Sequence, residues 1–134
     1  MPYRETADAS ILVVGLNGVV VGLAQQSGEI LWKNELKGGG VGQVALEIVG
    51  QRILASAEGD KLFCLDYQTG STIWEAKTTH AGGEALSTII LVRNDRIFIS
   101  KWGYTDCFSW EGARLWSQDL KGLGVGRATL RLPA

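Results

Sequence analysis

The chain has 134 residues, of which 46% are apolar and 20% are charged, enough for the core and the surface of one modest domain. Its net charge of -1, with both signs interspersed, provides no basic stripe for a nucleic-acid backbone and no polybasic segment for an anionic membrane. No apolar run approaches the roughly 20 residues of a membrane span, and residues 1–10 carry Asp and Glu where a signal peptide would be basic and then apolar. We therefore expect a cytoplasmic protein with no nucleic-acid or membrane partner.

Runs of β-branched residues separated by turn residues dominate the chain, and they predict an all-β fold without helices. The first unit is predicted to contain three strands, at Ile11–Gly15, Val19–Ala24 and Glu29–Leu36. The second unit is predicted to contain four, at Gln43–Val49, Arg52–Ala57, Lys61–Asp66 and Thr72–Lys77. The third also has four, at Ala85–Val92, Arg96–Lys101, Thr105–Ser109 and Arg114–Leu120.

A repeated segment organises these strands. Residues 64–74 read Cys-Leu-Asp-Tyr-Gln-Thr-Gly-Ser-Thr-Ile-Trp, and recognisable copies lie 42 residues upstream and downstream. One glycine and one tryptophan keep their register in every copy, at Gly28, Gly70 and Gly112 and at Trp32, Trp74 and Trp116. A period of about 40 to 45 residues with a turn glycine and a tryptophan in each unit is typical of propeller blades.

The last segment predicts how the units are completed. Residues 120–126 repeat residues 36–42 at six of seven positions, so Arg127–Leu132 should form the first strand of a fourth unit. This strand supplies the one that the first unit lacks, which gives three four-stranded blades. We expect one half-propeller domain over residues 1–134, with repeat units at about 10–36, 37–78 and 79–120 and with residues 121–132 as the inner strand that closes the first blade of a partner chain.

The repeated residues have a structural role in this interpretation. A glycine at the turn supplies a positive φ, and the hydroxyl of Thr69 or Ser27 can bond to the local backbone and tie the corner. A tryptophan at the start of the outer strand can bury about 200 Å² between two blades while its N–H reaches a carbonyl.

The middle copy resembles the pyrroloquinoline quinone repeat family, whose blades read Ala-x-Asp-x-x-Thr-Gly-x-x-x-Trp. It matches that pattern at Asp66, Thr69, Gly70 and Trp74, with Cys64 in place of Ala. The resemblance implies a β-propeller. The family includes quinoprotein dehydrogenases, a lipoprotein scaffold of outer-membrane protein assembly and sensor modules of bacterial kinases, so the fold does not decide among functions.

The residues needed for catalysis are sparse. The same resemblance implies that a quinoprotein holds its cofactor with adjacent cysteines, a stacking Trp, an Arg and carboxylates bound to calcium. In this chain Cys64 and Cys107 lie in different repeats, so we expect both to be reduced and buried. Trp102 could stack and Glu84 or Asp60 could meet a metal, but the carboxylates lack the spacing of a calcium loop. The lone histidine, His80, has no nucleophile motif beside it. We expect no enzymatic activity and no cofactor.

Binding is expected on one rim of the propeller, where the crossings between blades and the loops between second and third strands meet. The rim residues are Lys37, Gln43, Glu58, Asp60, His80, Glu84, Lys101, Trp102, Tyr104, Lys121 and Arg127. Gln43 and Arg127 occupy equivalent sites near the channel mouth and are the first candidates for ligand contact. Trp102 and Trp110 lie outside the repeat pattern; either could anchor a partner, or Trp110 could fill a gap left by a shortened turn.

These expectations combine into an assembly. Propellers close with typically 4 to 8 blades, so three blades per chain predict a homodimer that forms one six-bladed ring by strand exchange. The predicted function is a non-catalytic scaffold that binds another protein or a small ligand on the rim. The alternatives are a lectin-like or small-ligand binder at the propeller rim and a quinoprotein-type enzyme fragment.

Overall fold

The computed structural model describes residues 11–81 and 88–133, which form antiparallel sheets and loops. The strands are β1 (Ile11–Leu16), β2 (Val19–Ala24), β3 (Ile30–Asn34), β4 (Ala45–Val49), β5 (Arg52–Ser56), β6 (Lys61–Asp66), β7 (Thr72–Lys77), β8 (Thr88–Arg93), β9 (Arg96–Lys101), β10 (Tyr104–Ser109) and β11 (Arg114–Gln118). None of the described residues belongs to a helix long and apolar enough to cross a membrane.

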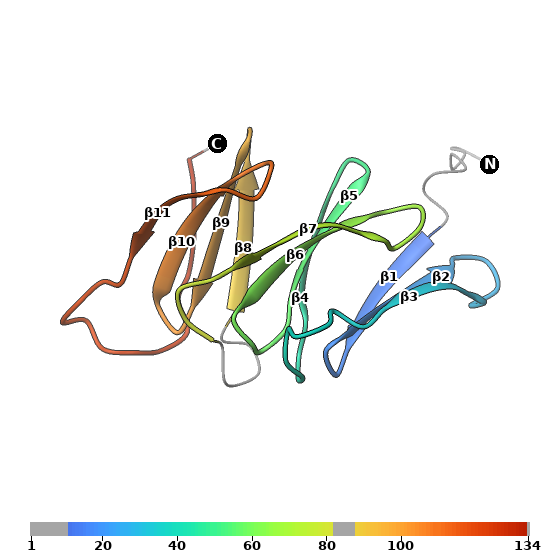
Figure 1. Cartoon of the computed structure of the whole chain (residues 1–134), viewed down its shortest axis with the longest axis horizontal. Helices are drawn as coiled ribbons and strands as arrows, with labels where there is room; N and C mark the ends of the chain where they lie inside the picture. The colour runs from blue at the N-terminus through green and yellow to red at the C-terminus, as the bar shows by residue number, and fades with distance from the viewer. Residues whose placement is uncertain (1–10, 82–87, 134) are drawn as a thin grey trace.

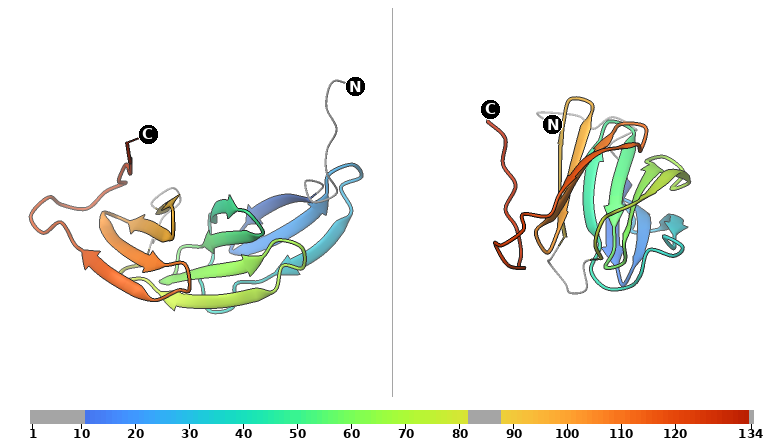
Figure 2. Two further views of the ribbon diagram at one scale, coloured as in Figure 1. Left: turned by 90° about the horizontal axis from the view of Figure 1, so that it is seen from above. Right: turned by 60° about the vertical axis from the view of Figure 1, so that its left-hand side comes forward.

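Three sheets stand side by side along an arc (Figure 1). Blade 1 has the order β1-β2-β3, blade 2 the order β4-β5-β6-β7 and blade 3 the order β8-β9-β10-β11. Seen from above, β1, β4 and β8 lie on the concave side of the arc and β3, β7 and β11 on the convex side (Figure 2). The predicted all-β propeller class and the order of strands within each blade are therefore confirmed.

Most predicted strand bounds agree with the structure. β2, β6, β7 and β9 span the predicted residues, and most of the others differ by one or two residues at an end. Residues 85–87 of the predicted eighth strand lie outside the described residues.

Residues 127–132 form no ladder within the single chain, so the strand expected there, which was predicted to pair with a second copy, stays a prediction. The reason is topological: by the repeat, its pairing partner is the inner edge of blade 1, at the opposite end of the arc. β1 pairs only with β2 among the described residues, so no strand covers that edge, although the Tyr67 hydroxyl accepts the N–H of Ile11 at 3.3 Å and donates to the Ile11 carbonyl at 2.8 Å.

The turn that precedes each outer strand fixes the blade geometry. In blade 2, the Asp66 carboxylate accepts hydrogen bonds from the backbone N–H of Thr69 at 2.9 Å and from its hydroxyl at 3.0 Å. Gly70, with a φ of 75°, donates its N–H to the Asp66 carbonyl at 2.7 Å. The Thr69 hydroxyl accepts from the N–H of Ser71, as the Ser27 hydroxyl does from that of Glu29, so both predicted corner bonds are present.

Among the described residues, the buried apolar side chains form two clusters, each packed between neighbouring blades. The first lies between blades 1 and 2 and contains Val20, Trp32, Leu36, Val44, Ile53, Ala55, Ala57, Phe63, Leu65 and Tyr67. The second lies between blades 2 and 3 and contains Leu54, Leu62, Cys64, Ile90, Ile97, Ile99 and Phe108. Strands of blade 2 are therefore apolar on both faces, because each face is covered by another blade.

Candidate interaction site

On the rim, a network of backbone hydrogen bonds connects blade 1 to blade 2. Gly18, in the β1–β2 turn, donates its N–H to the carbonyl of Gly42 at 2.8 Å. Residues 58 and 59, in the β5–β6 turn, donate theirs to the carbonyls of Val41 and Gly39 at 3.1 and 2.8 Å. The glycine-rich crossing at residues 36–42 is thus held between two turns, as expected for a tight passage from an outer strand to the next inner strand.

Several predicted rim residues come together around this crossing. The carboxylate of Glu58 accepts the backbone N–H of Gln43 at 3.4 Å, and the Gln43 side chain is exposed. Asp60 forms an ion pair with Lys77 at 3.7 Å. Arg127 is also exposed, while Glu84 lies outside the described residues.

Lys101 is buried, although the sequence predicts it among the rim residues that are available for binding. Its side chain is only 1% exposed, and its ammonium donates hydrogen bonds to the carbonyls of Ala57 at 2.8 Å and Gly59 at 2.6 Å. Burial lowers the pKa of Lys101 to about 8, although the charges of Asp60, Asp106 and Glu58 oppose the shift. Lys101 therefore ties blade 3 to a turn of blade 2 instead of facing solvent.

The remaining rim aromatics lie on blade 3. The ring of Tyr104 stacks on His80 with their centroids 4.3 Å apart. Trp102 is half-buried in a turn with a φ of 57°, and its carbonyl accepts the N–H of Gly126 at 3.4 Å. A hollow of about 200 Å³ lies between Tyr104 and the crossing at residues 119–125.

Of the two roles that the sequence leaves open for Trp110, the structure supports packing, because its side chain is partly buried against the cluster between blades 2 and 3. Its carbonyl accepts hydrogen bonds from the Trp74 indole at 3.2 Å and from the Arg52 guanidinium at 3.1 Å. The Arg52 guanidinium also lies 5.1 Å from the centre of the Trp110 ring. Nothing in the repeat pattern pointed to Arg52, since its partner is far away along the chain.

The described residues do not fit a calcium-bound quinone site. The two cysteines are free, buried and located in separate blades, and burial raises the pKa of the Cys64 thiol. The Glu58 carboxylate is bonded to the backbone, the Asp60 carboxylate pairs with a lysine, and the Lys101 ammonium lies beneath the same turn. In the described part of the chain, no three His, Cys, Asp or Glu side chains are grouped as metal ligands.

One end of the arc is the outer face of blade 1, which is aliphatic. Val13 and Val20 face blade 2, so the alternating positions face away from it. Those positions are paired as Leu12 with Leu23, Val14 with Val21 and Leu16 with Val19. Leu12 and Leu16 are 55% and 63% exposed, although a polar surface is expected for a sheet face that meets water.

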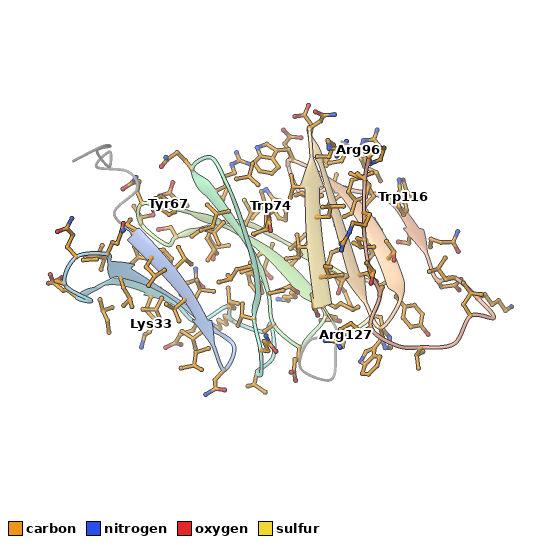
Figure 3. All side chains as sticks on the ribbon, turned by 180° about the vertical axis from the view of Figure 1, so that it is seen from behind. Lys33, Tyr67, Trp74, Arg96, Trp116 and Arg127 are labelled. Atoms are coloured by element: carbon orange, nitrogen blue, oxygen red, sulfur yellow. The ribbon has the colours of Figure 1, made fainter. Side chains whose placement is uncertain are left out.

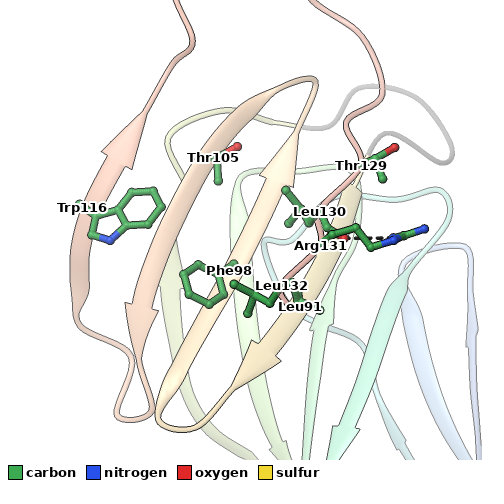
Figure 4. A pocket seen from close by; sticks show the side chains of 8 residues that line it. All are labelled: Leu91, Phe98, Thr105, Trp116, Thr129, Leu130, Arg131 and Leu132. Carbon is green, nitrogen blue, oxygen red and sulfur yellow. Dashed lines mark hydrogen bonds between the residues drawn. The ribbon is translucent and has the colours of Figure 1, made fainter. Parts of the chain in front are cut away.

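The other end is the outer face of blade 3, where Trp116 lies (Figure 3). Its ring is 6.1 Å from that of Phe98 between centroids, and both border a hollow of about 370 Å³. The segment at residues 129–132 lies across this hollow (Figure 4), and the carbonyl of Pro133 accepts a 2.6 Å hydrogen bond from Arg93.

Comparisons with known proteins agree with this architecture. BamB from Moraxella catarrhalis is 21% identical with a TM-score of 0.65, over 81% of this chain and 34% of that chain. A europium-containing methanol dehydrogenase is 17% identical with a TM-score of 0.62, over 81% of this chain and 23% of that one. The quinohemoprotein alcohol dehydrogenase from Comamonas testosteroni is 18% identical with a TM-score of 0.62, over 81% and 19%.

The chain thus spans 34% or less of the length of each of these structures, and these identities show the fold alone. No curated protein sequence matches it significantly. The family described as outer membrane protein assembly factor BamB matches residues 16–131. Because this match covers most of the chain, the protein belongs to that family of pyrroloquinoline quinone-like β-propeller repeats.

Proposed function

We propose that the protein is a non-catalytic propeller scaffold in which two copies close one six-bladed ring. The observation that carries this proposal is the complementarity of the two ends of the arc. Blade 1 lacks the inner strand that the other two blades have, and its β1 edge is open among the described residues. Beyond blade 3, residues 129–132 lie against the outer sheet face, on the side where the inner strand of a following blade would lie.

The register of blade 2 supports the pairing of this segment with β1 of a second copy. Leu46 lies opposite Ala55 in the β4–β5 ladder and packs against the cluster that faces blade 1. Leu130 corresponds to Leu46 by the repeat of 84 residues, and it borders the hollow on blade 3 in the same manner. Val14 holds the place of Ala55 in blade 1, because it pairs with Val21 as Ala55 pairs with Phe63, 42 residues after Val21. In the proposed ladder Leu130 therefore lies opposite Val14 of the second copy, and the exchange is reciprocal because a two-fold axis relates the chains.

Six blades fall within the range of about 4 to 8 at which propellers close. In the closed ring, the face of blade 3 that carries Phe98 and Trp116 would cover the aliphatic face of blade 1, where Leu12 and Leu16 are exposed. Exposed apolar faces and open strand edges promote aggregation, so burying both stabilises the assembly.

The rim is the proposed surface for another protein or a small ligand, with Gln43 and Arg127 as first contacts. The match to a family described as an outer membrane protein assembly factor supports an interaction role. The poor fit of the described residues to a quinone site supports a role without catalysis. The cytoplasmic location stays a prediction from the sequence.

The mass in solution tests the assembly. Light scattering on the intact chain should give twice the mass of one chain across a dilution series. A well-folded monomer would overturn the proposal, and blades from a longer protein or from a different chain would then be the better account of the two open ends.

A further inference from the structure

The two interior blade boundaries share one contact between a tryptophan and a glycine. The Trp32 ring of blade 1 covers Gly70 of blade 2 so closely that a Cβ on Gly70 would overlap the indole. The Trp74 ring of blade 2 covers Gly112 of blade 3 in the same way, and a Cβ there would lie 2.7 Å from the ring. Each tryptophan therefore docks on the turn of the following blade, at a residue that must be glycine.

Each of these indoles also donates a hydrogen bond into the turn that it covers. The Trp32 N–H donates to the carbonyl of Tyr67 at 3.2 Å, and the Trp74 N–H donates to that of Trp110 at 3.2 Å. This satisfies the only polar atom of the side chain, so the ring is buried without an unpaired donor. Trp32 is accordingly only 9% exposed.

The two ends of the arc carry the two halves of a third such contact. Gly28 has a φ of 78°, close to the 75° of Gly70, but no atom lies within 4 Å of the place where its Cβ would be. Trp116 keeps the register of Trp32 and Trp74, yet it is 42% exposed. The first blade therefore offers a vacant turn, and the third blade offers a tryptophan that covers no turn among the described residues.

A second side chain repeats the same arrangement. The Asn34 side-chain oxygen accepts the N–H of Leu36 at 2.8 Å, which directs its amide nitrogen to the carbonyl of Gly70 at 2.7 Å. Gln118 corresponds to Asn34, and its side-chain oxygen accepts the N–H of Leu120 at 3.1 Å. Its amide nitrogen is thereby available for the blade that follows blade 3.

We propose that Trp116 of one copy docks on the Gly28 turn of a second copy, with the Gln118 amide donating to the Gly28 carbonyl. This inference rests on the proposed ring of two chains and names the contact that joins them. The contact occurs twice in the dimer, because the two-fold axis makes both junctions equivalent. A buried tryptophan at the centre of an interface is the residue type that most often dominates binding energy.

Two pairs of variants test the contact. Trp116→Ala removes the ring, and Leu115→Ala is its control, since Leu115 is the adjacent residue and is similarly exposed at 46%. Gly28→Ala places a methyl where the ring would lie. Gly50→Ala is its control, because Gly50 has a φ of 61° and also open space around its Cβ position, so both alanines impose similar backbone strain.

The dimer dissociation constant should rise at least about 100-fold for Trp116→Ala and for Gly28→Ala, and by less than about 10-fold for the two controls. Analytical ultracentrifugation measures it, and circular dichroism checks the fold of each variant. If the wild-type protein is a dimer and neither test variant weakens it more than its control, this inference is overturned while the ring proposal stands. A monomeric wild-type protein overturns both.

A mixing experiment tests the pairing of these two residues across the junction. A mixed dimer of one Trp116→Ala chain and one Gly28→Ala chain has one junction in which an intact Trp116 meets an intact Gly28. Native mass spectrometry should therefore find more mixed dimer than the half expected from random pairing. A random distribution would overturn the pairing of Trp116 with Gly28.

Discussion

The ammonium of Lys101 on blade 3 lies 2.6 Å from the carbonyl oxygen of Gly59 on blade 2, and it joins two turns of the rim beneath the surface. The same turn of blade 2 donates hydrogen bonds to the crossing that follows blade 1. A single buried lysine thus connects the last blade of the chain to a network that reaches the first.

This burial predicts how Lys101 affects stability as the pH changes. The pKa of Lys101 is lowered from 10.5 to about 8, so the unfolded chain keeps its proton over a pH range in which the folded chain has lost it. Between about pH 8 and 10.5 the unfolded state binds more protons, and the contribution of Lys101 to stability therefore rises with pH.

Compared with Lys101→Met, the wild-type protein should gain up to about 3 kcal/mol of unfolding free energy over this range, with little change below it. Urea unfolding of both proteins at pH 7 and pH 10 measures the difference. Subtracting the unfolding free energy of the methionine variant removes the pH dependence that arises from all other titratable groups, because both proteins contain them. A difference that stays constant between the two pH values would show that the ammonium is not desolvated.

The Gly70 turn predicts a large difference between two neighbouring substitutions. Gly70→Val should lower the unfolding free energy by about 3 kcal/mol or more, because a β-branched residue resists a positive φ and its side chain would displace the Trp32 ring. Gln68→Ala should change it by less than about 0.5 kcal/mol, since it loses only an exposed hydrogen bond to Gln51. Equal melting temperatures for the two variants would contradict the role of this turn.

The blades could be predicted from the sequence because their determinants are local. The two-residue turn at Asn17 and Gly18 has φ values of 51° and 81°, which is the pattern that an Asn-Gly pair favours in a hairpin. Apolar alternation and a glycine turn in each repeat fixed the other strands in the same way. The inter-blade role of Trp32 and Trp74 was also predictable, since the repeat places one tryptophan in each unit.

The features that the sequence does not predict depend on contacts between residues that are far apart along the chain. Lys101 and Ala57 are 44 residues apart, and Arg52 and Trp110 are 58 apart. Because no periodicity marks such pairs, the sequence predicts Lys101 on the rim surface and indicates no role for Arg52. The strand at residues 127–132 was predicted from its likeness to β4, but a strand needs a neighbour to pair with, and the single chain supplies none there.

Calcium and pyrroloquinoline quinone should leave the protein unchanged. The carboxylates of Glu58 and Asp60 are bonded to a backbone N–H and to a lysine, and the cysteines are buried in separate blades. A ligand at about 100 times its dissociation constant would add about 2.7 kcal/mol of stability, which a thermal melt detects easily. A clear rise in melting temperature, or a new absorbance band that survives dialysis, would contradict this prediction.

Removing the segment beyond blade 3 should prevent the dimer from forming. Deletion of residues 126–134 leaves each blade 1 without an inner strand, so we expect an unstable or insoluble chain. A pair of point variants gives a sharper result. Leu130 and Arg131 both border the hollow on blade 3, but Leu130 is half-buried and corresponds to the half-buried Leu46, whereas Arg131 is exposed and corresponds to the exposed Glu47.

Leu130→Asp should therefore weaken the dimer at least about 30-fold, because it places a charge among apolar side chains, while Arg131→Asp should weaken it much less. Sedimentation at several concentrations measures both. Equal effects of the two substitutions would mean that the segment does not adopt the alternation of an inner strand. Unchanged dimerisation of the truncated chain would exclude strand exchange altogether, since the open edge of β1 would then have no role in joining the two copies.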